Sequence, residues 1–137
     1  MDIRFYVKFI VSLLITKFAF ADVVDVNNKQ ILELSNSNIS IVDVRSISEW
    51  EQTGVIPDSI LLTFFDKEGN YNFDEWYEKL RLEIDEGKPI ILICRTGRRT
   101  KIIAEMMDKK FDNVIYNAKS GITSWTVSYT HLRAHET

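Results

Sequence analysis

The segment ILICRTGRRT, residues Ile91–Thr100, places the only cysteine of the chain at the end of an apolar run. The β-branched and leucine residues before Cys94 predict a strand that is buried on both faces, as in parallel sheets. Gly97 predicts a tight turn, and the apolar spacing after it predicts a helix over about Arg99–Lys109. Cys94 is therefore expected where a buried strand turns into a helix, next to three arginines.

Strand and helix patterns alternate along the rest of the chain. Strands are expected in DVVDV, ISIVDV (Ile39–Val44), SILLTFF and NVIYNA. Helices are expected after an Asn27 or Asn28 cap, in ISEWEQ behind the Ser46/Glu49 capping box and in FDEWYEKLRLEI, and a last turn or helix is expected in SGITSW. This alternation predicts one α/β domain with a central, largely parallel sheet. We expect Trp50, Phe73 and Trp76 in its core.

The two ends of the chain do not fit the domain. Residues 1–21 combine a basic start, the apolar run FIVSLLIT and the small-x-small end AFA, which predicts a secretory signal. The apolar run is shorter than the about 20 residues of a membrane span, so cleavage is favoured over retention as an anchor. We therefore expect a bacterial periplasmic or secreted protein with no stable membrane association after cleavage. The domain is placed at residues 22–126. Residues 127–137 form a tail that is a frayed, truncated or non-native end.

Composition excludes several classes of function. The chain has 137 residues, of which 45% are hydrophobic and 27% charged, as in a soluble globular domain. A net charge of −3 without a basic stripe argues against nucleic acid as a partner. A single cysteine allows no internal disulfide, no C-x-x-C redox pair and no cysteine-rich zinc site, so neither metal nor cofactor is expected. The two histidines, His131 and His135, lie too close to the C-terminus for a Cys–His dyad in the domain.

The loop after Cys94 has the features of an anion site. Ligands of open α/β sheets bind at the carboxyl ends of the strands, and loop amides at a helix N-terminus cradle anions. The same amides and nearby arginines lower the pKa of a thiol, so Cys94 can be a thiolate without histidine. Thr100 is expected to cap the helix or to hydrogen-bond the sulfur. A lone buried cysteine is more often a core residue. However, cations at a helix N-terminus are unfavourable without a bound anion, which favours a functional interpretation.

At this point the residues resemble a known family. Cys94-Arg95-Thr96-Gly97-Arg98-Arg99-Thr100 is similar to the active-site loop C-R-x-G-x-R-[ST] of rhodanese-type sulfurtransferases. Upstream, the chain resembles the family's first signature at Asp43, Val44, Arg45, Glu49, Trp50, Gly54, Ile56, Pro57 and Ser59, with Val55 in place of a common histidine. Downstream, Gly121 and Trp125 resemble the closing element. The resemblance spans about Val23–Trp125.

This resemblance implies a rhodanese-like three-layer domain whose mostly parallel, five-stranded sheet is flanked by helices. It implies that Cys94 is the catalytic nucleophile and takes a sulfane sulfur from thiosulfate or a similar anionic donor as a persulfide. The acceptor would be cyanide or a thiol. The implied substrate-binding residues are Arg95, Thr96, Gly97, Arg98, Arg99 and Thr100. The implied supporting residues are Asp43, Arg45 and Glu49, and we expect Arg45 and Glu49 to form a structural ion pair.

Two alternatives remain open. A cysteine phosphatase or arsenate reductase needs one more residue between cysteine and arginine than the four that separate Cys94 from Arg99, and an acid in the loop. That reading is therefore the weaker one. A non-catalytic or sulfur-carrier binding module is compatible with the same residues, although such modules usually lack the cysteine. The sequence leaves the oligomeric state open.

Overall fold

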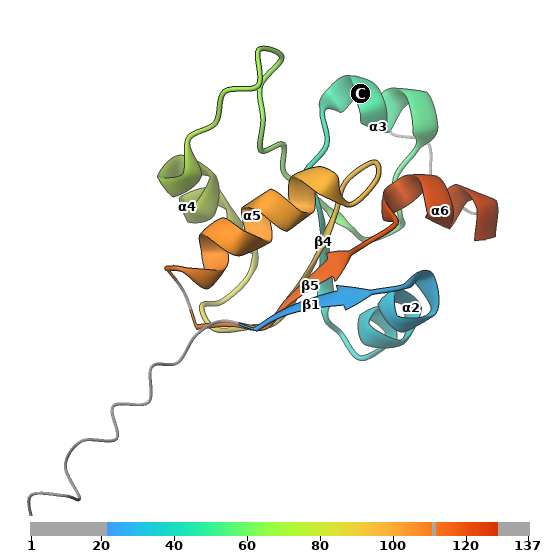
Figure 1. The fold of residues 1–137 in the computed structure, drawn as a ribbon, viewed down its shortest axis with the longest axis horizontal. Coiled ribbons are helices and arrows are strands. Elements are labelled where there is room, and N and C mark those ends of the chain that lie inside the picture. The colour runs from blue at the N-terminus through green and yellow to red at the C-terminus, as the bar shows by residue number, and fades with distance from the viewer. Residues whose placement is uncertain (1–21, 111, 129–137) are drawn as a thin grey trace, which may run out of the picture.

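The computed structural model describes residues 22–110 and 112–128 (Figure 1). The predicted signal, residues 1–21, lies outside the described residues, as does the tail beyond residue 128. No helix within the described ranges is long and apolar enough to cross a membrane.

Five strands form one sheet in which every pair is parallel. They are β1 (Val23–Val26), β2 (Ser40–Asp43), β3 (Ile60–Leu61), β4 (Ile90–Ile93) and β5 (Ile115–Ala118). Their order is β1-β5-β4-β2-β3, which places β4 at the centre of the sheet. All four residues of β4 are buried, as the continuous apolar run predicts for a strand covered on both faces. The predicted five-stranded α/β fold is confirmed.

The helices cover both faces of the sheet, which makes three layers (Figure 1). They are α2 (Asn28–Asn36), α3 (Ile47–Thr53), α4 (Phe73–Glu83), α5 (Arg98–Asp108) and α6 (Gly121–Ser128). Capping boxes start two of them: the side chain of Asn27 accepts from the Gln30 amide, and that of Ser46 accepts from the Glu49 amide. The predicted helix starts at these two caps are therefore confirmed.

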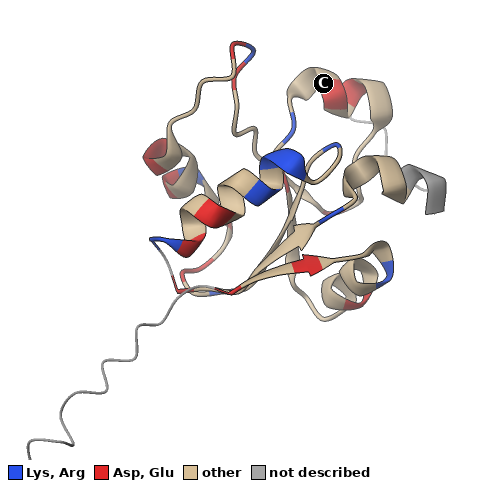
Figure 2. Ribbon diagram, viewed as in Figure 1, with Lys and Arg blue, Asp and Glu red and all other residues tan. Residues whose placement is uncertain are grey.

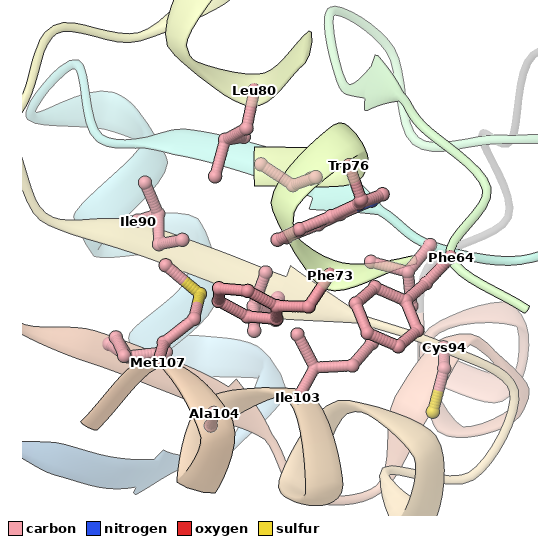
Figure 3. Packing of buried hydrophobic residues seen from close by; sticks show 13 residues of the cluster. Phe64, Phe73, Trp76, Leu80, Ile90, Cys94, Ile103, Ala104 and Met107 are labelled. Atoms are coloured by element: carbon pink, nitrogen blue, oxygen red, sulfur yellow. The ribbon is translucent and has the colours of Figure 1, made fainter. Parts of the chain in front are cut away.

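Alternation along β4 divides the core into two clusters. Ile90, Leu92 and Cys94 face α4 and α5, where Phe73, Trp76, Leu80, Ile103, Ala104 and Met107 are buried (Figure 3). Ile91 and Ile93 face the opposite side, toward buried side chains of α2 and α6. Trp50, Phe73 and Trp76 are all buried, so the prediction that they are core residues is confirmed. Cys94 thus lies on the α5 side, at the carboxyl edge of the sheet.

Two predicted boundaries differ from the structure. The strand in SILLTFF is only two residues long, and beyond it the amides of Leu62 and Phe64 donate to the carbonyls of Asp43 and Val44 at 3.0 and 3.2 Å, two residues apart on one side against one on the other. The helix expected from Arg99 begins at Arg98, since Gly97 already takes the left-handed cap position with φ +86°. The loop between β4 and α5 therefore runs from Cys94 to Gly97.

Candidate active site

Cys94 follows the last residue of β4 and is 1% exposed. The amide of Val44, just after β2, donates to the carbonyl of Ile93 at 3.1 Å. The end of β4 is therefore still hydrogen-bonded to the segment that follows β2 where the loop begins. The chain then turns within three residues into α5, and Gly97 takes a conformation that side chains disfavour. A central strand, a tight turn and a helix N-terminus therefore position the sulfur.

The sulfur of Cys94 lies inside the turn. The amide of Gly97 donates to Sγ at 3.2 Å, and Oγ1 of Thr100 lies 3.6 Å from it. Burial raises the pKa of the Cys94 thiol, but hydrogen bonds from Thr100 and from the amides of Thr96 and Gly97 outweigh burial. The pKa of Cys94 therefore lies below its ordinary value, without a histidine. This arrangement favours a thiolate nucleophile.

The loop is held from outside by the start of α6. The amide of Ile122 donates to the carbonyl of Cys94 at 2.8 Å. The amide and the hydroxyl of Thr123 donate to the carbonyl of Arg95 at 3.2 and 2.8 Å. Because these carbonyls point toward α6, the loop is free to turn its amides toward the sulfur.

Two glycines permit this close packing of backbone on backbone. A Cβ on Gly97 would collide with the carbonyl oxygen of Lys119, and one on Gly121 would collide with the carbonyl of Arg95. Both glycines also have positive φ values, +86° and +63°. Any side chain at either position would displace the loop that holds Cys94.

Thr100 is fully buried and contacts more than the sulfur. Its hydroxyl lies 2.6 Å from Oδ1 of Asn117 and 3.2 Å from the carbonyl oxygen of Gly97. The amide of Asn117 in turn donates from Nδ2 to Oδ1 of Asp25 at 2.8 Å. The expectation that Thr100 contacts the sulfur is met, and the helix is capped by Gly97 without a side-chain cap bond.

The expected ion pair between Arg45 and Glu49 is wrong. Glu49 instead binds Arg99 through two hydrogen bonds, Nη1 to Oε2 at 2.9 Å and Nη2 to Oε1 at 2.6 Å. The hydrogen bonds from Arg99 hold the pKa of Glu49 down at about 2, and the same contact raises the pKa of Arg99. Glu49 also accepts from the amide of Ser46 at 3.0 Å, so it joins the start of α3 to the first turn of α5.

Arg45 pairs with Asp43, and both side chains are 1% exposed. Its guanidinium donates to both carboxylate oxygens of Asp43 at 2.9 to 3.2 Å, to Thr53 Oγ1 at 2.6 Å and to the carbonyl of Gly54 at 2.8 Å. With its donors used inside the protein, Arg45 is not available to a substrate anion. Asp43 and Arg45 tie the end of β2 to the end of α3.

Two cations of the loop remain available. Arg95 and Arg98 are exposed, whereas Arg99 is half-buried and paired. Figure 2 shows basic residues on the turn between β4 and α5 and on the start of α5. These arginines are placed to attract an anion to the loop.

An open cleft of about 1040 Å³ lies beside the Glu49–Arg99 pair. Ile47, Thr63 and Phe65 contribute to its walls, whereas Cys94 does not line it. The ion pair therefore borders this cleft, whereas the sulfur does not.

The sequence interpretation missed the partners of Thr100. Asn117 is a polar residue in an otherwise buried strand, and it is 2% exposed. Such a residue needs a hydrogen-bond partner, and this was the available signal. Asp25 gave no comparable signal, because it lies on the exposed edge strand β1 and meets Asn117 only through the β1–β5 register. Among the described residues, no group of three or more potential ligands could hold a metal ion.

Comparisons with known proteins bear on the family and the fold of the chain. The family model described as "Rhodanese-like domain" matches residues 27–128. A curated protein of Bacillus subtilis (strain 168), named "Putative sulfur carrier protein YrkF", is 29% identical over 92 residues. That match covers 67% of this chain and 44% of the relative, so the chain spans less than half of that protein.

Two solved structures illustrate the likeness of fold. The crystal structure of Rv0390 from M. tuberculosis has a TM-score of 0.62 and 27% identity, and the match covers 74% of this chain and 80% of that one. The solution structure of the polysulfide-sulfur transferase homodimer from Wolinella succinogenes has a TM-score of 0.62 and 19% identity, with coverage of 100% and 95%. At that identity, the second likeness concerns the fold alone.

Proposed function

The chain belongs to the rhodanese-like domain family, and on that premise we propose that it is a sulfurtransferase working through a Cys94 persulfide. The observation that carries the proposal is the sulfur itself, which is buried, receives the Gly97 amide at 3.2 Å and has a lowered pKa. A structural cysteine in an apolar core needs none of these donors.

The reaction is a double displacement. The Cys94 thiolate attacks the outer sulfur of an anionic donor such as thiosulfate, an S–S bond forms to Cys94, and the donor's S–S bond breaks. Sulfite leaves with the electron pair, while the outer sulfur stays on Cys94 as a persulfide. A cyanide or thiol acceptor then attacks that outer sulfur, and the Cys94 thiolate leaves.

The roles of the loop follow from its geometry. The amides around Sγ stabilise negative charge on the thiolate and on the terminal sulfur of the persulfide. Arg95 and Arg98, exposed at the loop, attract the anionic donor and stabilise the departing sulfite. Arg99 attracts the donor only at shorter range, because the carboxylate of Glu49 offsets its positive charge.

The buried position of Cys94 favours this chemistry over phosphoryl or arsenate chemistry. At 1% exposure, the sulfur suits a small donor that presents a single terminal sulfur better than a bulky tetrahedral ester. Four residues separate Cys94 from Arg99, and no acidic residue stands between them.

A sulfur-carrier role is the second candidate, because the B. subtilis relative is named for such a role. A carrier and an enzyme would hold the same persulfide and would differ in turnover. The carrier would be loaded once and would release its sulfur only to a protein partner.

The test is intact-mass analysis before and after thiosulfate, then after cyanide. We expect a gain of one sulfur atom that cyanide removes, and we expect no gain in Cys94→Ala, whose fold is checked by circular dichroism. Repeated thiocyanate release indicates an enzyme, whereas a persulfide that forms but is not discharged by cyanide indicates a carrier. If Cys94→Ala retained sulfur transfer, the proposed mechanism would be wrong.

We also propose that residues 1–21 direct export and are removed, on the strength of their basic, apolar and small-x-small sequence. The test is expression of the full chain in a bacterial host, followed by fractionation and mass analysis. A periplasmic chain that begins at Asp22 supports export. An intact chain in the cytoplasm contradicts it.

A further inference from the structure

A series of polar side-chain contacts leads from the candidate nucleophile, Cys94, to the edge strand of the sheet. Cys94 Sγ lies 3.6 Å from Oγ1 of Thr100, Thr100 donates to Oδ1 of Asn117 at 2.6 Å, and Asn117 donates to Oδ1 of Asp25 at 2.8 Å. Cys94, Thr100 and Asn117 are each at most 2% exposed. The last link crosses from β5 to the edge strand β1, where Asp25 and Asn117 are direct partners in the parallel register.

Thr100 has one hydroxyl proton for three acceptors. The carbonyl of Gly97 and Oδ1 of Asn117 only accept, and a thiolate at Cys94 only accepts. With a neutral thiol, Thr100 donates to Asn117 and receives the thiol proton. With a thiolate, Thr100 can stabilise the sulfur only by withdrawing its proton from Asn117.

Asp25 determines which end of the Asn117 amide faces Thr100. A carboxylate accepts hydrogen bonds and does not donate them, so it holds the NH2 group of Asn117. A rotated amide would set two oxygen acceptors against each other. The carbonyl oxygen of Asn117 must therefore point to Thr100 and compete with the sulfur for its proton.

We propose that Asp25 and Asn117 are positioning residues, which hold the hydroxyl proton of Thr100 away from Cys94 until the thiolate forms. They limit the thiolate fraction of the resting protein. In the persulfide, Sγ is a neutral divalent sulfur and a weak acceptor, so the proton returns to Asn117. The role rests on the proposed use of Cys94 as the nucleophile.

The test is the rate at which the folded protein is alkylated at Cys94 by iodoacetamide, measured across pH. This readout needs no sulfur donor, so it does not depend on sulfur transfer. We expect Asp25→Ala and Asn117→Leu to raise the rate at neutral pH by about threefold to tenfold, the worth of one hydrogen bond. The midpoint of the pH profile should move down accordingly.

Asp25→Asn is the matched control, because it removes the charge but keeps an oxygen that can hold the Asn117 amide. It should behave like the wild type if the hydrogen bond matters, and like Asp25→Ala if only the charge matters. Every variant keeps the other charged groups around this end of β4, which are Arg95, Arg98, Arg99, Asp43, Arg45 and Lys119.

Combining Asp25→Ala with Thr100→Val separates a positioning role of Asp25 from a general effect on the structure. In Thr100→Val the proton in question is absent, so Asp25→Ala should change nothing further. The proposal is overturned if Asp25→Ala matches the wild type, if Asp25→Asn matches Asp25→Ala, or if the rise persists in the Thr100→Val background. Loss of sulfur transfer with these alkylation results intact would overturn the proposed function alone.

Discussion

Two arginine–carboxylate pairs lie at the same end of the sheet and differ in burial. In the Asp43–Arg45 pair both side chains are 1% exposed, and Arg45 has further acceptors in Thr53 and Gly54. In the Glu49–Arg99 pair the side chains are 24% and 29% exposed, and the pair borders an open cleft. The chemistry of the two pairs is the same, so burial and additional partners decide their roles.

The burial of a pair determines which charges can respond to a substrate. Removing one member of a buried pair leaves an uncompensated charge in a low dielectric, which is costly. A partly exposed pair exchanges with water and is screened, so its members can reorient at modest cost. The first pair is therefore scaffold, and the second can adjust when an anion reaches the loop.

The largest expected effect is on the buried pair. Arg45→Met should lower the free energy of unfolding by about 3 to 5 kcal/mol, because it leaves the Asp43 carboxylate buried without its partner. Urea unfolding measures this. The double variant Asp43→Leu/Arg45→Met should lose less than the single one. A loss under about 1 kcal/mol in Arg45→Met would mean that this pair is no more structural than a surface pair.

The next effect is the acid sensitivity of the Glu49–Arg99 pair. The pKa of Glu49 is about 2 in the folded protein against an ordinary 4.5, so its contribution to stability is fully present above pH 4.5. That contribution is lost as the pH falls from about 4.5 through 2. After a discount for solvent screening, it is worth about 1 to 2 kcal/mol.

Glu49→Gln should therefore be less stable than the wild type at pH 6, and the gap should close toward pH 2. Chemical unfolding at several pH values gives both curves. A gap that stays constant with pH would show that the carboxylate charge is not the cause.

A smaller effect is expected on the KM for the sulfur donor. If thiosulfate is the donor, Glu49→Gln should lower its KM by about twofold to fivefold, because Arg99 loses its competing carboxylate. Arg98→Ala should raise KM by a similar factor, and high salt should reduce both changes. Glu51→Gln, on the exposed side of α3, is the matched control and should leave KM unchanged. Equal changes in Glu49→Gln and Glu51→Gln would indicate a general charge effect.

The smallest effect is expected at an ion pair on the surface. Lys79 and Glu75 lie 2.7 Å apart along α4, with side chains 56% and 59% exposed. Lys79→Ala should leave the thermal midpoint unchanged within error, because water and salt screen this contact. A clear loss of stability would contradict the ranking of the pairs by burial.

Most of the fold could be predicted from local patterns. Periodicity and capping residues predicted every described strand and helix, and the alternation predicted a parallel sheet. Only the length of the strand in SILLTFF was wrong, because an apolar run does not reveal where regular strand pairing ends. The cap at Gly97 moved the start of α5 by one residue.

The site could be predicted only in part. The motif around Cys94 marked the candidate nucleophile and the loop, because both lie within seven consecutive residues. The partner of Glu49 could not be predicted, since Arg99 lies 50 residues away and Arg45 was the nearer candidate in sequence. Asn117 and Asp25, separated by 92 residues, meet only through strand register.

Local patterns in the chain are enough to place the strands and helices in alternation, Cys94 at the end of a buried strand, and a glycine turn after it. These follow from local properties, namely side-chain period, capping and the conformational freedom of glycine. The packing of distant elements sets which carboxylate binds which arginine, which arginines remain exposed, and which acceptors surround the hydroxyl of Thr100. Those outcomes depend on distances between elements far apart in the chain, and on the burial that makes a charge or an acceptor require its partner.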